Sequence, residues 1–236
     1  MLDSVHSAHS PLDDRPPPGW KRIYEVVALG ARFFRGFGHK GVRGPEDGPP
    51  AMVIPGFLAN DRTTMELRRG MARAGWRVHP WGLGFNWGAR ADTLERIDAQ
   101  VKAASPHEPL LLVGWSLGGM YAREYARAHP DRVRAVVTLG SPFSGDPHAN
   151  NVWRLYEFVA GHPVDNPPVP RITAKPPVPH LAIWSRKDGI VSPRSARGLP
   201  DETDAAVELD SSHMGFGVSR HVVDQVAAEI DRFLRR

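Results

Sequence analysis

Residues 114–118, Gly-Trp-Ser-Leu-Gly, have the types and the spacing that expose a nucleophilic serine. They follow the apolar run Leu110–Trp115, which predicts a strand, and they lead into Leu117–Ala128, which has helical spacing. A serine at so sharp a strand-to-helix turn has a strained backbone, and the glycines two residues to either side remove side chains that would collide. The motif therefore predicts that Ser116 is a nucleophile. The N–H of Leu117 would then face the negative charge that an attack on a carbonyl group creates.

A serine hydroxyl is a weak nucleophile and needs a base beside it. The candidate base among the eleven histidines is His213. It lies between the strand predicted at Ala205–Leu209 and the helix predicted at Val218–Leu234, on a loop that returns to the carboxyl edge of the sheet. Four other histidines lie at predicted helix ends or in the irregular segment that follows Pro142, where contact with solvent explains them: His129, His148, His162 and His180.

The base in turn needs a carboxylate that orients it and stabilises its protonated form. Asp188 follows the strand predicted at Leu181–Ser185 and is the preferred candidate. Its rival is Asp210, three residues before His213. The alternative interpretation of Asp210 is a polar residue at a strand end or turn.

Stabilising the oxyanion takes a second N–H besides that of Leu117. The loop Ile54–Asn60, after the first predicted strand, is the natural donor. Gly56 lets the chain bend close to a substrate, and Phe57 then offers its backbone amide. The alternative is that Pro55 and Gly56 form an ordinary turn.

Four large apolar residues are candidates for contact with the substrate. Phe85 and Trp87 belong to the glycine-rich loop 82–88, which lacks a dinucleotide-binding fingerprint and is expected at the rim of the pocket. Trp115 and Met214 flank the proposed nucleophile and base, where ordinary packing explains them equally well. Because no group of His, Asp or Glu residues has metal-ligand spacing, we expect neither a catalytic metal nor a cofactor.

Strand and helix signals alternate from Ala51 onward, which predicts a mostly parallel sheet of about six strands, covered by helices on both sides. The alternation breaks between Phe143 and Pro179, where a helix-like stretch, Asn151–Ala160, leads into a proline-rich run. We expect this segment to form a small cap over the carboxyl edge of the sheet, where such folds bind ligands. The remaining strands are expected at Ala51–Ile54, Trp76–Trp81 and Val133–Leu139, and the remaining helices at Thr63–Ala74 and Ala91–Ala104.

The first fifty residues differ from the rest of the chain. Residues 1–19 are polar and proline-rich and are expected to be a disordered arm, and residues 38–50 a linker to a domain spanning 51–236. Residues 20–37 have apolar side chains at three- and four-residue steps, which predicts an amphipathic helix. We favour a helix packed on the domain; the alternative is a peripheral contact with a membrane or lipid surface.

The composition narrows the class of protein. A chain of 236 residues fits one folded domain, and its formal charge of +4 is not gathered into a basic stripe, so we expect no nucleic-acid partner. The absence of cysteine excludes disulfides and cysteine catalysis. With no signal peptide or membrane-spanning run evident, we expect a cytoplasmic protein, while a secreted mature form and the oligomeric state stay open.

Taken together, residues 51–236 resemble the α/β-hydrolase superfamily, and within it the lipases and esterases. The resemblance rests on residues 114–120 and 132–142, on Asp188–Val191, and on the chain order of nucleophile, acid and base. It departs at Pro55, where the family often has a histidine, although the backbone role of Phe57 does not need that side chain. Two early strands of larger members are not evident, as in compact bacterial lipases. The serine at 116 differs from the aspartate of haloalkane dehalogenases.

The resemblance implies a serine-dependent hydrolase of carboxylic esters that acts through an acyl-enzyme on a small-molecule or lipid ester. Acyltransferases, thioesterases and peptidases use the same machinery, so these activities stay open. A hydrolase fold retained as a binding module is the remaining alternative. Such modules usually lack a member of the triad, and this chain has Ser116, Asp188 and His213.

Overall fold

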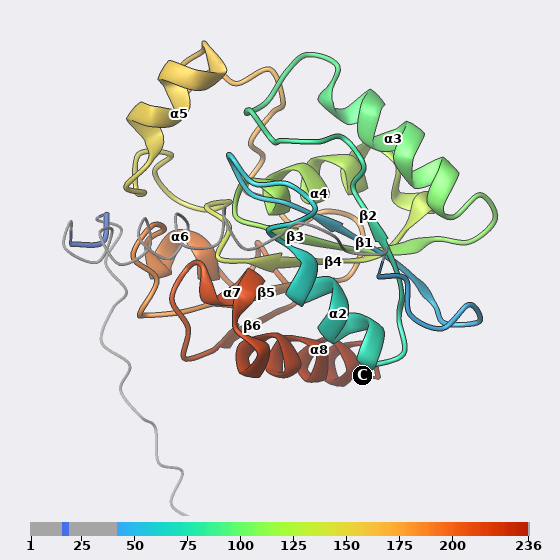
Figure 1. Cartoon of the computed structure of the whole chain (residues 1–236). Coiled ribbons are helices and arrows are strands. Elements are labelled where there is room, and N and C mark those ends of the chain that lie inside the picture. The colour runs from blue at the N-terminus through green and yellow to red at the C-terminus, as the bar shows by residue number, and fades with distance from the viewer. Residues whose placement is uncertain (1–15, 19–41, 236) are drawn as a thin grey trace, which may run out of the picture.

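Six parallel strands form the centre of the molecule. The computed structural model describes residues 16–18 and 42–235, and in it the strands pair in the order β2-β1-β3-β4-β5-β6 (Figure 1). The strands are β1 (Pro50–Ile54), β2 (Arg77–Pro80), β3 (Leu110–Trp115), β4 (Val133–Leu139), β5 (His180–Trp184) and β6 (Ala205–Glu208). The predicted helix-covered, mostly parallel sheet of about six strands is confirmed, and each strand end lies within one residue of its expected place.

The inner strands β1 and β3 are buried along their whole length. Continuous burial requires cover on both faces of the sheet, which explains why the sequence of β3, Leu-Leu-Leu-Val-Gly-Trp, does not alternate. The edge strand β6 alternates between half-buried and exposed residues, as expected where one face meets solvent.

Helices lie on both faces of the sheet (Figure 1). One face carries α3 and α4, and the other carries α2 and α8. Their bounds are α2 (Met65–Arg73), α3 (Thr93–Ala104), α4 (Leu117–Ala128) and α8 (Arg220–Leu234).

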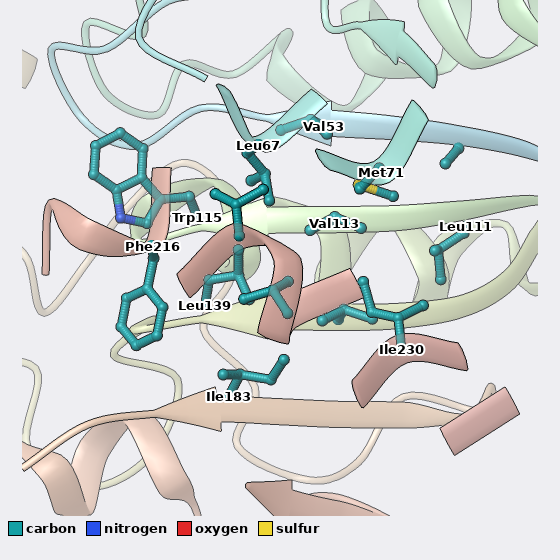
Figure 2. Packing of buried hydrophobic residues seen from close by; sticks show 14 of the residues in the cluster. Val53, Leu67, Met71, Leu111, Val113, Trp115, Leu139, Ile183, Phe216 and Ile230 are labelled. Carbon is teal, nitrogen blue, oxygen red and sulfur yellow. The ribbon is translucent and has the colours of Figure 1, made fainter. Parts of the chain in front are cut away.

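Successive residues of each strand pack into the hydrophobic cores on opposite faces of the sheet, because side chains alternate across a sheet. Val113 packs in the cluster beneath α2 and α8, whereas its neighbour Leu112 packs beneath α3 and α4. Figure 2 shows the first cluster, in which Leu67 and Met71 of α2 and Ile230 of α8 cover the strand side chains.

Short helices gather near the carboxyl ends of the strands (Figure 1). The helix expected at Val218–Leu234 is broken at Ser219, whose extended backbone separates α7 from α8. The sequence analysis missed α6, although Ser192 and Pro193 are start signals: Ser192 Oγ accepts the N–H of Ser195 (3.1 Å). The short helices at this edge are α5 (Trp153–Ala160), α6 (Pro193–Arg197) and α7 (Gly215–Val218), whereas a 3-10 turn (Pro130–Arg132) lies at the opposite edge and leads into the amino end of β4.

Of the first fifty residues, the structure describes only 16–18 and 42–50, so the predictions for this region can be compared with it only there. The helix expected at 20–37 lies outside the described residues. In the short described part of the arm, Pro17 is buried, and its carbonyl accepts a hydrogen bond from Asn151 Nδ2 (2.8 Å). Near the middle of the expected linker, the Arg43 carbonyl accepts the N–H of Val78 (2.7 Å), so this part of the chain runs beside β2.

Arg123 of α4 ties the irregular segment after β4 to the sheet. Its side chain is 1% exposed, and its guanidinium group donates to His180 Nδ1 (2.8 Å) and to the carbonyls of Thr173 (2.6 Å) and Ala174 (2.9 Å). Burial and the neighbouring Arg123 lower the pKa of His180 to about 3. His180 is therefore a neutral core residue, and its expected role in contact with solvent is wrong.

The pKa of His180 predicts part of the acid sensitivity of the fold. The folded protein keeps His180 neutral down to about pH 3, whereas an unfolded chain protonates it near the ordinary histidine pKa of 6.5. The unfolded state therefore binds more protons as the pH falls from 6.5 toward 3, and stability falls by up to about 1.4 kcal/mol per pH unit.

A His180→Asn variant, which keeps an acceptor for Arg123, should show a shallower decline of the free energy of unfolding over this window. Urea unfolding at several pH values measures both slopes. Equal slopes in the wild type and the variant would contradict the assignment.

Candidate active site

Ser116 has a strained backbone at the turn from β3 to α4, with φ 54° and ψ −123°. A non-glycine residue in this region costs about 1–3 kcal/mol, and such strain persists only where the surroundings hold it. Here the N–H of Ser116 donates to the carbonyl of Leu139 on β4 (2.9 Å). The predicted strand-to-helix turn at Ser116 is therefore present, and the serine is half-buried.

The two glycines of the motif clear different neighbours. A Cβ at Gly114 would lie 2.3 Å from the Cα of Gly119, so Gly114 makes room for the first turn of α4. A Cβ at Gly118 would lie 2.3 Å from the carbonyl oxygen of Ile54 and 2.7 Å from that of Pro55. Gly118 therefore lets α4 approach the end of β1, a contact that the sequence analysis did not foresee.

The strand order places the loop after β1 beside Ser116. The chain leaves β1 toward β2 on one side and leaves β3 toward β4 on the other, so the carboxyl ends of β1 and β3 flank the point where parallel sheets bind ligands. A Cβ at Gly56 would lie 3.0 Å from the Cβ of Ser116. This separation is tighter than an ordinary Cβ contact, so a side chain at position 56 would press on Ser116, and glycine avoids that crowding.

Asp188 and His213 form a buried hydrogen-bonded pair. Asp188 Oδ2 lies 2.7 Å from His213 Nδ1, and the two side chains are 1% and 5% exposed. The other carboxylate oxygen accepts the N–H groups of Ile190 and Val191, both at 2.8 Å. The backbone thus fixes the carboxylate, and the carboxylate orients the imidazole ring.

The loops after β5 and β6 bring this pair to the carboxyl edge of the sheet that Ser116 also occupies. Trp115, next to the serine, connects the two: its indole Nε1 donates to the carbonyl of His213 (3.1 Å). The rival carboxylate Asp210 is exposed and pairs with Lys187 (2.7 Å). The geometry favours Asp188 as the partner of His213.

Phe57 and Leu117 line one cavity together with Ser116, as an oxyanion site requires. Within the described residues, neither backbone N–H has a hydrogen-bond partner. Both amides are thus available to a developing negative charge.

The cavity beside Ser116 has a volume of about 70 Å³, and most of its walls are apolar. Residues after β4 supply one wall, so the segment expected to cap the sheet edge does border the nucleophile. The sequence analysis marked this segment by its broken pattern but had no signal for its individual residues. The wall residues from it are Pro147, Asn150, Val152, Trp153, Tyr156, Val164, Pro167 and Arg171.

None of the four residues proposed to contact substrate lines the cavity beside Ser116. Phe85 and Trp87 line a second cavity of about 280 Å³, which Asn86 also lines. Trp115 and Met214 are buried in the core beneath α2 and α8, as the packing alternative holds. Their contact with substrate stays a prediction.

Residues 16–18 and 42–235 were also searched for groups that could bind a metal ion and for helices that could span a membrane. They contain no group of three His, Asp or Glu residues arranged to hold a metal ion. Among the helices of these ranges, none is long and apolar enough to cross a membrane.

Comparison with known proteins identifies the family. Residues 35–163, more than half of the chain, match the family described as alpha/beta hydrolase fold, and the chain belongs to that family. Pimeloyl-(acyl-carrier protein) methyl ester esterase from Salmonella heidelberg (strain SL476) is 47% identical over 60 residues. That match spans 25% of this chain and 23% of the relative.

Solved structures share the fold at lower identity. Naproxen esterase (carboxylesterase NP) from Bacillus subtilis is 17% identical, with a TM-score of 0.53 over 81% of this chain and 85% of its own. The thioesterase domain from the curacin biosynthetic pathway is 16% identical, with a TM-score of 0.56 over 78% of this chain and 92% of its own. At such identities these structures show the common fold.

Proposed function

We propose that this protein hydrolyses carboxylic esters through an acyl-enzyme intermediate. The observation that carries the proposal is the buried 2.7 Å hydrogen bond between Asp188 and His213, at the same sheet edge as the strained turn of Ser116. An acid held by two backbone N–H groups, an oriented imidazole and a serine hydroxyl that borders a cavity are the parts that nucleophilic acyl transfer needs.

In the first half of the reaction, Ser116 Oγ attacks the ester carbonyl carbon while His213 takes the hydroxyl proton. The backbone amides of Phe57 and Leu117 donate to the oxyanion of the tetrahedral intermediate. The intermediate then collapses, the bond to the alcohol oxygen breaks, and His213 returns the proton to the departing alcohol. The acyl group remains on Ser116.

In the second half, water attacks the acyl-enzyme, and His213 takes a proton from it. Collapse of the second intermediate releases the carboxylic acid and returns the proton to Ser116. Throughout, Asp188 accepts a hydrogen bond from His213 Nδ1–H and stabilises the imidazolium.

Two features favour an ester over other acyl substrates. The relative with 47% local identity is by name a methyl ester esterase, and naproxen esterase shares the fold. A thioester is the second candidate, because the curacin thioesterase domain also shares the fold and the same steps would cleave a carbon–sulfur bond.

The size of the cavity argues for a short group at the catalytic centre. A cavity of about 150 Å³ accepts benzene, a ligand of six carbons. The cavity beside Ser116, at about 70 Å³, is half that size and suits roughly three carbons. Acetyl to butyryl groups fit this cavity better than long acyl chains. The proposed substrates are therefore small esters and not lipid esters.

Substitution of the proposed triad tests the mechanism. Ser116→Ala and His213→Ala should each lower kcat on p-nitrophenyl butyrate by about 10⁴-fold or more, and Asp188→Asn by about 10⁴-fold, since each removes a part of one proton-transfer unit. Asp210→Asn is the matched control and should stay within a few-fold of wild type, because Asp210 pairs with Lys187 at the surface. Wild-type turnover in Ser116→Ala would refute the mechanism.

Acyl-chain length tests the substrate class. The ratio kcat/KM should be highest for p-nitrophenyl esters of two to four acyl carbons and should fall by roughly tenfold or more by eight, because the extra methylenes exceed the cavity. Butyryl oxygen and sulfur esters with matched leaving groups, assayed side by side, separate esterase from thioesterase. A ratio that rises to twelve carbons, or activation by emulsified triglyceride, would contradict this assignment and favour a lipase.

A further inference from the structure

Asn86 lies in the middle of the glycine-rich loop 82–88, and the proposed reaction assigns it no role. It is 1% exposed, an unusual degree of burial for an amide side chain outside a helix or strand. Its Nδ2 donates to the carbonyl of Pro55 (2.9 Å), in the loop that follows β1. Its backbone binds the same loop twice, with the carbonyl accepting from Leu58 N–H (2.7 Å) and the N–H donating to the carbonyl of Ala59 (2.8 Å).

These bonds fall on either side of one peptide unit. The Pro55 carbonyl belongs to the peptide before Gly56, and the Leu58 N–H belongs to the peptide after Phe57. Between them lies the Gly56–Phe57 peptide, whose N–H is the proposed oxyanion donor and has no partner among the described residues. Asn86 therefore fixes both neighbours of this peptide and leaves its N–H available.

The loop needs such support. Leu58 has φ 56°, a conformation that costs a side-chain-bearing residue about 1 kcal/mol or more. The loop also lies against the nucleophile, since a Cβ at Gly56 would come within 3.0 Å of Ser116 Cβ. A displacement of even 1 Å at such a place would move the Phe57 N–H out of reach of an oxyanion.

The orientation of the Asn86 amide is itself determined by its neighbours. Its Oδ1 accepts from the N–H of Gly88 (3.2 Å) and lies 3.4 Å from the hydroxyl of Tyr121. Burial raises the pKa of Tyr121 well above its ordinary value, so that hydroxyl keeps its proton. Donors on one side and the Pro55 carbonyl on the other are consistent with one amide orientation only.

We infer that Asn86 is a positioning residue for the oxyanion site: its side chain holds the Pro55–Leu58 loop so that the Phe57 N–H faces the reacting carbonyl. The inference rests on the proposed function, because it assumes that Phe57 stabilises an oxyanion beside Ser116.

Two substitutions isolate the side-chain bond. Asn86→Asp keeps the shape of the side chain and an acceptor for Gly88, but the aspartate carboxylate has no donor for the Pro55 carbonyl. Asn86→Ala removes the whole amide and introduces no buried charge. Both keep the backbone bonds of residue 86 to Leu58 and Ala59, so the loop stays attached to the fold.

For both variants kcat on p-nitrophenyl butyrate should fall roughly 10- to 100-fold, with KM within about threefold of wild type. The basis is that one oxyanion donor is worth about 10²- to 10³-fold in kcat and that a misplaced donor loses part of this. The inhibition constant of a small alkyl boronic acid, whose serine adduct mimics the tetrahedral intermediate, should rise by the factor by which kcat/KM falls.

Ser105→Ala is the matched control for a general loss of stability. Ser105 is 2% exposed, and its Oγ donates to the carbonyl of Glu108 (2.6 Å), just before β3 and at the opposite edge of the sheet. It should lower the Tm but leave kcat and boronic-acid inhibition unchanged. A kcat within twofold of wild type in either folded Asn86 variant would overturn the inference. So would a loss of kcat in Ser105→Ala matching that of the Asn86 variants.

Ser116→Ala, assayed in the same experiment, separates the two proposals. Full activity in Ser116→Ala would refute the proposed function itself. An inactive Ser116→Ala together with fully active Asn86 variants would refute only the positioning role.

Discussion

The backbone turn at Ser116 is the constraint on which the rest of the site depends. Its φ of 54° is unfavourable for a serine, and close packing of β1, β3 and α4 around it holds the residue there. Gly118 lets α4 press on the carbonyls of Ile54 and Pro55, which sets where the loop after β1 begins. On the other side, Trp115 reaches the carbonyl of His213 and fixes the loop after β6. One turn thus locates both the candidate oxyanion donors and the candidate base.

Buried hydrogen bonds to backbone carbonyls and N–H groups then orient the parts that packing brings together. Two N–H groups hold the Asp188 carboxylate, and the Asn86 amide holds the carbonyl of Pro55. Arg123 does the same for the segment after β4 that forms one wall of the cavity. Each of these side chains is buried, where an unmade hydrogen bond costs about 1–3 kcal/mol, so each loop has one strongly preferred position.

Local patterns in the sequence were enough to predict where the strands lie, because buried parallel strands have continuous apolar runs such as Leu110–Trp115. The glycines around Ser116 likewise predicted the turn, since their spacing has a steric cause. Long-range contacts could not be predicted from such patterns. Nothing near His180 in the sequence reveals that it is buried beside Arg123, 57 residues away, and stays neutral in the core. Asn86 shows the same limit, because its loop looked like a pocket rim and its partner Pro55 is 31 residues away.

The most direct test of the account is the site and the base dependence of covalent labelling by a fluorophosphonate. Wild-type protein should take up one phosphonyl group, and peptide mass spectrometry should locate it on Ser116. His213→Ala should slow the labelling by about 10³-fold or more, because the hydroxyl then lacks its base. Adduct formation on a residue other than Ser116, or an undiminished labelling rate in His213→Ala, would contradict the account.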